Sequence, residues 1–282
     1  MHKEGGMNMF EYDELKVYRG KDIQITPKII VTQPTLDQIE EFGEKRYFNA
    51  VHTLTAVGAD LKWQLWDYNQ IDYTQIEDYD LFIRFISQVI SSKKKIYNEL
   101  MNNPEKYAEQ LAKLSQNDLD EMLINPMQLI LKDIDLADFD LYKTKDERII
   151  LYNAERDITI DRAVYSQIVD IVRKIHGFKR NNEVPANERT KMDLIEDARD
   201  EAMLASRTPY KSVLKQLVSS LTVKCGLCGD DKIWNMNIAA FFDNIKRVSK
   251  IQDAELLLQG AYSGFASLKS VDKSRLDWTG DI

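Results

Sequence analysis

Glycine, proline, cysteine and histidine are all scarce in this chain of 282 residues, which has 11 glycines, 6 prolines, 2 cysteines and 3 histidines. Few glycines and prolines argue against a fold built on many tight turns, such as a β-sandwich or a β-barrel, and favour helices. Two cysteines so close in sequence cannot cross-link a fold of this size, so we expect a reducing, cytosolic compartment. Histidine is the commonest general base, and its scarcity gives catalysis little support.

Long apolar runs and an excess of basic residues are also missing. No segment approaches the roughly 18 consecutive apolar residues of a membrane-spanning helix. The first residues, MHKEGGMNMFEYDELK, are too polar and acidic for a secretory signal. The net charge of −8 does not fit a protein whose main task is to neutralise nucleic-acid phosphates. We therefore expect neither a membrane nor a nucleic acid as the partner.

Motifs that carry catalytic chemistry are absent as well. The chain contains no glycine-rich phosphate loop, no G-x-S-x-G and no H-E-x-x-H. Its histidines, His2, His52 and His176, stand in unrelated contexts, and we interpret His176 as a charge that stabilises the end of a helix. The 46 acidic residues offer many carboxylate pairs, and periodicity selects none of them. We expect a protein that is not an enzyme and binds no cofactor.

Both cysteines, Cys225 and Cys228, lie in the stretch KCGLCGDD. A structural zinc site needs four ligands, and a redox site needs the pair where a strand meets the start of a helix. Here a predicted helix precedes the pair and a turn follows it, which favours two thiols in an interhelical turn. The alternative is a zinc ion shared across an oligomer interface, which would make the chain a zinc or thiol regulatory module.

An acidic run comprises Asp133, Asp135, Asp138 and Asp140. It lacks the central glycine and the distant glutamate of an EF-hand calcium loop. Carboxylates at the edge of a strand also prevent pairing with other chains, and we interpret the run in this way.

Hydrophobic periodicity predicts the order of the elements. We expect two short strands at 14–18 and 23–31, a helix at 36–56 with Thr35 as its N-cap, and an apolar helix at 79–92. A hairpin at 138–153 with a returning strand at 157–161 follows. The remaining predicted helices cover 162–177, 188–206, 211–223, 233–251 and 254–264.

These elements predict an α+β fold that is predominantly α-helical. We expect the N-terminal hairpin and the central hairpin to join in one small antiparallel sheet with helices packed on it. The polar stretch KRNNEVPANERT, residues 179–190, is the best candidate for a linker. The predicted domains are therefore an α+β body at 1–180 and a helical C-terminal lobe at 181–282.

Aromatic residues are concentrated in two places. They crowd between residues 63 and 79 and recur toward the C-terminus. Most aromatic side chains fill cores, but Trp, Tyr and Met are also favoured on partner surfaces. Our candidates for contact with a partner protein are Trp63, Trp66, Tyr68, Trp234, Met236, Phe241, Phe242 and Trp278.

Several phrases, in their order, carry a resemblance to a known family. They include QPTLDQIEEFGEKRYF, QLWDYNQIDYTQIEDYDLF, NPMQLIL, ITIDRAVYSQIVDIVRKIHGF, PANERTK, IWNMNIAAFFDNIKRVSKI, GAYSGF and LDWTG. The chain resembles, from about Tyr12 to Gly280, proteins encoded in the tail modules of long-tailed bacteriophages and prophages. These proteins are encoded beside the tape-measure protein and are treated as tail assembly chaperones. The cysteine pair is not part of the resemblance.

The resemblance implies a non-enzymatic late protein of the bacterial host cytoplasm. Its partner would be the tape-measure protein or another tail protein, bound during tail morphogenesis. The alternative is a structural component of the virion, such as a tail-completion or connector protein.

Overall fold

The computed structural model describes residues 13–105, 112, 124–227, 231–265 and 271–280, and these residues are mostly helical. The first helix lies where we expected a strand. Residues 14–18 form α1 (Glu14–Tyr18) because the Asp13 carboxylate accepts hydrogen bonds from the backbone N–H groups of Leu15 and Lys16. The N-terminal hairpin therefore lies within residues 23–31, which we expected to form a single strand. Its two strands are β1 (Ile23–Thr26) and β2 (Ile29–Val31), with Pro27 and Lys28 between them.

Thr35 is the N-cap that the sequence predicted, in a capping box with Gln38. The expected helix at 36–56 is two helices, α2 (Leu36–Phe42) and α3 (Glu44–Thr55). Gly43 separates them with a φ of 99°, a conformation that other residues rarely adopt. The chain turns at this glycine, so that both helices bury their apolar faces in the same core.

We did not expect a helix at α4, but the helices from α5 onward follow the predicted order more closely. Helix α8 ends at Gly177, in the left-handed conformation, as predicted. Helix α11 is continuous where we expected two helices, because no glycine or proline interrupts residues 251–259. The bounds are η1 (Gly58–Leu61), α4 (Lys62–Asn69), α5 (Asp78–Asn102), η2 (Leu136–Asp138), α8 (Arg162–His176), α9 (Glu188–Ser206), α10 (Val213–Lys224), α11 (Ile238–Tyr262) and η4 (Lys273–Arg275).

The fold class is confirmed as mostly helical with antiparallel hairpins, but the two hairpins do not share one sheet. The pair β1–β2 forms one sheet, and β3 (Asp140–Lys143), β4 (Ile149–Asn153) and β5 (Ile158–Ile160) form another. An irregular segment occupies the other edge of β2: Thr32 N–H donates to the Ile130 carbonyl at 2.9 Å, and Lys132 N–H donates to that of Ile30 at 3.0 Å. These bonds occupy one edge of the N-terminal sheet, so the central hairpin cannot pair there.

The main core surrounds α8. Buried side chains of this helix pack with others from α2, α3, α5, both sheets, α10 and α11. A smaller apolar cluster lies under α4 and α9; its buried members are Val57, Ala59, Leu65, Tyr73, Leu81 and Ile195. Because α10 and α11 contribute to the main core, it draws on both predicted domains; the division at residue 180 stays a prediction.

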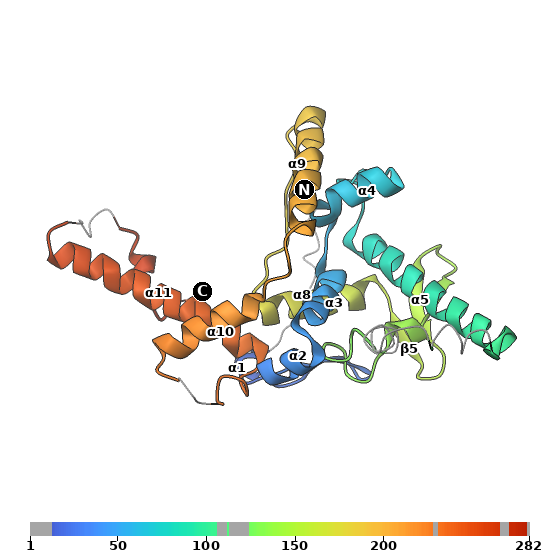
Figure 1. Cartoon of the computed structure of the whole chain (residues 1–282), viewed down its shortest axis with the longest axis horizontal. Helices are drawn as coiled ribbons and strands as arrows, with labels where there is room; N and C mark the ends of the chain where they lie inside the picture. The colour runs from blue at the N-terminus through green and yellow to red at the C-terminus, as the bar shows by residue number, and fades with distance from the viewer. Residues whose placement is uncertain (1–12, 106–111, 113–123, 228–230, 266–270, 281–282) are drawn as a thin grey trace, which may run out of the picture.

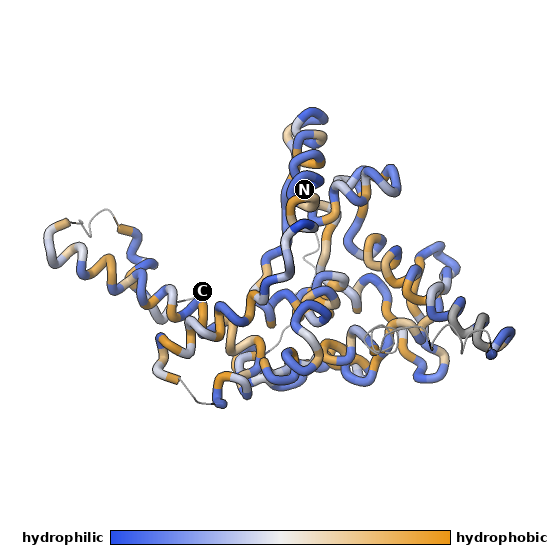
Figure 2. Tube along the Cα trace, in the orientation of Figure 1, coloured by the Kyte–Doolittle hydropathy of each residue, from blue (hydrophilic) through white to orange (hydrophobic). Residues whose placement is uncertain are grey.

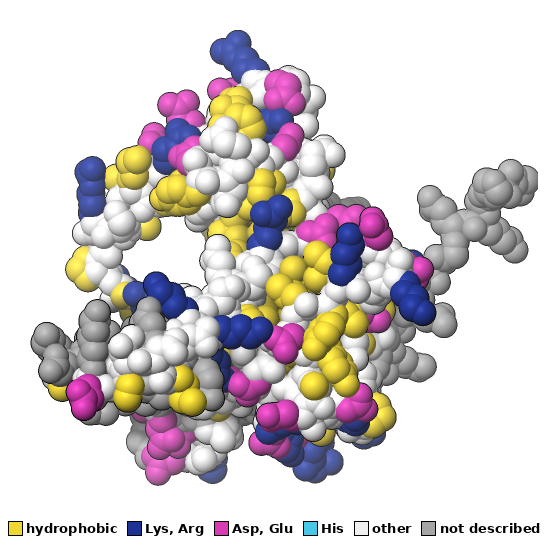
Figure 3. Space-filling view, turned by 90° about the vertical axis from the view of Figure 1, so that its right-hand side faces the viewer, with side chains coloured by type: hydrophobic (Ala, Val, Ile, Leu, Met, Phe, Trp, Pro, Cys, Tyr) yellow, Lys and Arg dark blue, Asp and Glu magenta, His cyan; other side chains and the backbone are white. Residues whose placement is uncertain are grey.

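Three helices extend from this centre in different directions: α5, α9 and α11 (Figure 1). Hydrophobic residues recur along α11 to its far end, beyond the centre of the molecule (Figure 2). Figure 3 shows an opening through the molecule, below the upper part that includes α9 in Figure 1. The connections 178–187 and 207–212 join α9 to the rest of the chain.

Among the described helices, none is both long and apolar enough to cross a bilayer.

His176 is buried, and our interpretation of it as a charge that stabilises the helix end is wrong. Its Nδ1 lies 2.6 Å from the Val172 carbonyl, which can only accept, so Nδ1 carries the proton. Its Nε2 then accepts a hydrogen bond from the Tyr47 hydroxyl at 2.7 Å. Burial lowers the pKa of His176 to about 4, so the ring is neutral at pH 7.

The first prediction concerns acid stability. The unfolded chain protonates His176 near pH 6.5 and the folded chain only near pH 4, so this residue's contribution is complete above pH 6.5 and is lost as the pH falls toward 4. The loss is about 3 kcal/mol. The variant His176→Gln should therefore lose less unfolding free energy between pH 7 and pH 4 than the wild type. Urea denaturation at both pH values measures this, with the exposed His52→Gln as the control. Equal losses in the wild type and His176→Gln would contradict the assignment.

Candidate functional site

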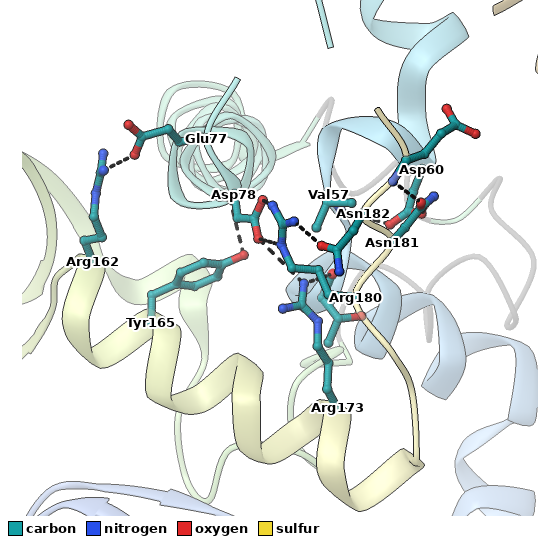
Figure 4. Close-up of polar contacts among 12 residues, drawn as sticks. Val57, Asp60, Glu77, Asp78, Arg162, Tyr165, Arg173, Arg180, Asn181 and Asn182 are labelled. Carbon is teal, nitrogen blue, oxygen red and sulfur yellow. Dashed lines mark hydrogen bonds and ion pairs between the residues drawn. The ribbon is translucent and has the colours of Figure 1, made fainter. Parts of the chain in front are cut away.

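The densest group of charged side chains lies at the start of α5 (Figure 4). Arg180 donates from Nε and Nη2 to the two carboxylate oxygens of Asp78, at 3.0 and 2.9 Å. Arg173 approaches the same carboxylate at 3.8 Å and donates to the Thr55 carbonyl at 2.7 Å. One carboxylate therefore joins α5 to α8 and to the connection that leads to α9.

The surrounding polar groups reinforce this joint. The Tyr165 hydroxyl donates to the carbonyls of Leu54 and Asp78, at 3.0 and 3.3 Å, and burial raises the pKa of this tyrosine. Asn181 donates to Asp60, whose other carboxylate oxygen accepts from the Val57 N–H. The ionised side chains thus have partners within the protein. This arrangement suits a structural joint between α3, α5, α8 and the 178–187 connection better than a site of proton transfer.

The acidic run also serves a structural role. Asp135 and Asp138 both pair with Lys93, and Asp140 pairs with Lys94, so the run attaches η2 and β3 to α5. Within the described ranges, no three His, Cys, Asp or Glu side chains are grouped to hold a metal ion. Cys225 follows the last residue of α10 and is exposed, whereas Cys228 lies outside the described residues. A shared zinc site therefore stays an untested alternative.

The first group of candidate contacts with a partner protein lies on α4, and two of its side chains help to attach α9 to α4. Trp63 and Trp66 are half-buried against the smaller cluster, which also receives Ile195 from α9. The Nζ of Lys191 lies 5.9 Å from the centre of a Trp66 ring and donates to Asp72 and Glu188 at 2.8 Å each. Tyr68, by contrast, is 74% exposed and remains available to a partner.

The second group is divided between core and surface. Phe241 is completely buried in the main core, and Met236 and Phe242 are half-buried beside it. Trp234 and Trp278 are exposed, and the Trp278 carbonyl accepts a hydrogen bond from Arg247. In this structure, only Trp234 and Trp278 of this group present large apolar areas to solvent.

Aromatic clustering missed several strongly exposed apolar side chains near the end of α11. Leu256, Tyr262 and Phe265, on and just after the outer half of α11, are 67%, 89% and 93% exposed. A signal for them exists in the sequence, because the consecutive Leu256, Leu257 and Leu258 cannot all point to one face of a helix. Arg275 pairs with Asp253 at 2.7 Å and holds the C-terminal segment against α11. We call Leu256, Leu258, Tyr262 and Phe265 the α11 surface.

A groove of about 1080 Å³ lies between α3 and α5. Its lining mixes Phe42, Val89 and Met127 with charged side chains, and Tyr210 from the α9–α10 connection reaches one side of it. The Nζ of Lys45 lies 6.0 Å from the centre of the Tyr210 ring. The mixed lining is more typical of a surface for a polypeptide than of a small-molecule pocket.

Comparisons with protein-family models, with curated proteins and with solved structures found no match to this chain.

Attachment of α9 through Lys191 generates a second prediction. Lys191→Met removes its pairs with Asp72 and Glu188, so the amides of α9 and α4 should exchange with deuterium about tenfold faster, while those of α8 are unchanged. Hydrogen exchange followed by mass spectrometry measures this. The matched control is Arg189→Met, an exposed residue on the same helix. If both variants exchange alike, Lys191 does not hold α9.

Proposed function

We propose that this protein is a non-enzymatic bacteriophage tail assembly chaperone that binds the tape-measure protein, or another tail protein, in the host cytoplasm. The observation that carries the proposal is the distribution of exposed apolar side chains. Among the described residues, most of the large ones lie in the C-terminal part of the chain: Phe178, Val184, Met192, Met203, Leu204, Tyr210, Val213, Val223, Trp234, Leu256, Leu258, Tyr262, Phe265 and Trp278. The buried core lies mainly in the preceding part.

Such a distribution suits a protein that binds another polypeptide. Exposed apolar patches that the protein's own core does not use commonly mark interaction sites. The resemblance implies a long helical partner whose apolar stripes are exposed until the tail tube forms around it. A chaperone can cover such stripes with its own apolar surfaces, and its net charge of −8 helps to keep the complex dispersed. A stable interface needs roughly 800 Å² on each partner, and one buried aromatic side chain supplies about 150–250 Å².

The α11 surface provides the test. Co-expression with the tape-measure protein should keep that protein soluble, and Leu256→Ser/Tyr262→Ser/Phe265→Ser should return most of it to the insoluble fraction. Removing these three side chains from the interface should weaken binding by at least about tenfold. The matched control, Leu15→Ser/Met101→Ser/Ile149→Ser, replaces exposed apolar residues elsewhere and should behave as the wild type. A tape-measure protein that is equally soluble with and without this chain contradicts the proposal.

Purified virions distinguish the chaperone from a structural component. A chaperone leaves before the tail is complete, so mass spectrometry of mature particles should not detect this chain. Its presence at a fixed copy number per particle would instead favour a tail-completion or connector protein.

A further inference from the structure

The segment from Ala202 to Gly229 contains no aspartate or glutamate, although the chain has 46 acidic residues. It contains four cations, namely Arg207, Lys211, Lys215 and Lys224. The helix before it is strongly acidic, since α9 carries Glu188, Asp193, Glu196, Asp197, Asp200 and Glu201. The charge therefore changes sign where α9 ends and the connection to α10 begins.

This connection is held at its far end and exposed along its length. The backbone N–H groups of Val213 and Leu214 both donate to one carboxylate oxygen of Glu44, at 2.9 Å each, which fixes the start of α10. Every residue from Met203 to Lys211 is exposed. A partner can therefore approach the connection without displacing a packed element.

Exposed apolar side chains and cations occur together on the connection and on the ends of α9 and α10 beside it. Met203, Leu204 and Tyr210 are 52%, 64% and 52% exposed. In the part of the chain that the structure describes, the side chains of Arg207, Lys211 and Lys215 form no ion pair. We call Met203, Leu204, Arg207, Tyr210, Lys211 and Lys215 the connection surface. Its complement is a surface with apolar anchors flanked by carboxylates.

We propose that the connection surface docks an acidic amphipathic helix of the partner polypeptide. The inference rests on the proposed function only for the identity of that partner, and it specifies the chemistry of the docking segment. A helix satisfies its own backbone hydrogen bonds and presents apolar side chains in one stripe with acids beside them, which complements the apolar side chains and cations of the connection surface. Nucleic acid fits less well, because exposed Met and Leu side chains offer nothing to phosphates and the whole chain is acidic.

Two designed helical peptides test the proposal. They share the same leucine stripe, and one carries glutamate where the other carries lysine. With the purified full chain, fluorescence anisotropy should show the glutamate peptide binding at least about tenfold more tightly, and added salt should reduce this preference. The variant Arg207→Glu/Lys211→Glu/Lys215→Glu should reverse it. The control Lys21→Glu/Lys145→Glu/Arg148→Glu makes the same change in net charge at exposed positions elsewhere and should retain the wild-type preference.

A second variant tests how much the apolar side chains of the connection surface contribute to peptide binding. Met203→Ser/Leu204→Ser should weaken binding of the glutamate peptide and leave its salt dependence unchanged, with circular dichroism confirming the fold of each variant. Four results would each overturn the proposal: equal binding of both peptides, no binding of either, no reversal in the charge variant, or tighter binding of duplex DNA than of the glutamate peptide.

The co-expression assay separates this result from the proposed function. If the charge-reversed variant solubilises the tape-measure protein as well as the wild type does, the function stands and the connection surface is not its site. If the peptides behave as expected and the tape-measure protein stays insoluble, the surface stands and the function does not.

Discussion

Burial of the apolar face of α8 is the interaction on which the rest of this structure depends. Tyr165, Ile168, Val169, Val172 and Ile175 of this helix are all buried, and the helices and both sheets of the main core pack around them. Most of the core packs around one central helix, and α5, α9 and α11 extend from this centre (Figure 1). Each of the three has one end that is well packed and another that is more exposed. Extended helices of this kind provide surface for binding that a more compact arrangement of the same chain would bury.

Charged groups position these helices. Asp78 and its two arginines join α5 to α8 and to the connection before α9, and Lys191 attaches α9 to the loop after α4. Lys93 and Lys94 attach the central sheet to α5 through the acidic run. Partly exposed pairs contribute little stability one by one, but they select one arrangement of the helices among several. These ion pairs therefore hold α5, α9 and the central sheet in place against the rest of the chain.

Elements governed by local signals could be predicted from the sequence. The Thr35 cap, the central hairpin and α8 with its glycine stop depend on residues next to one another in the chain. Two of the wrong predictions concern distant contacts. Residues 130–132 bond to the edge of β2, so this edge is closed to the central hairpin, and His176 is neutral because Tyr47 and aromatic rings from other helices enclose it. Nothing in the local pattern around either site contains that information.

The candidate site shows the same difference between what a local sequence pattern predicts and what the tertiary structure decides. Aromatic clustering selected Phe241, which is buried, and Trp63, which packs against the smaller cluster, because partner surfaces and cores favour the same residue types. The α11 surface depends instead on how far a helix extends beyond its neighbours, which only the structure shows.

The most direct measurement is hydrogen exchange of this protein with and without the purified tape-measure protein. The account predicts slower exchange at residues 203–215 and 256–265, with no change in β3 and β4. Protection confined to the central sheet, or no protection at all, would contradict it.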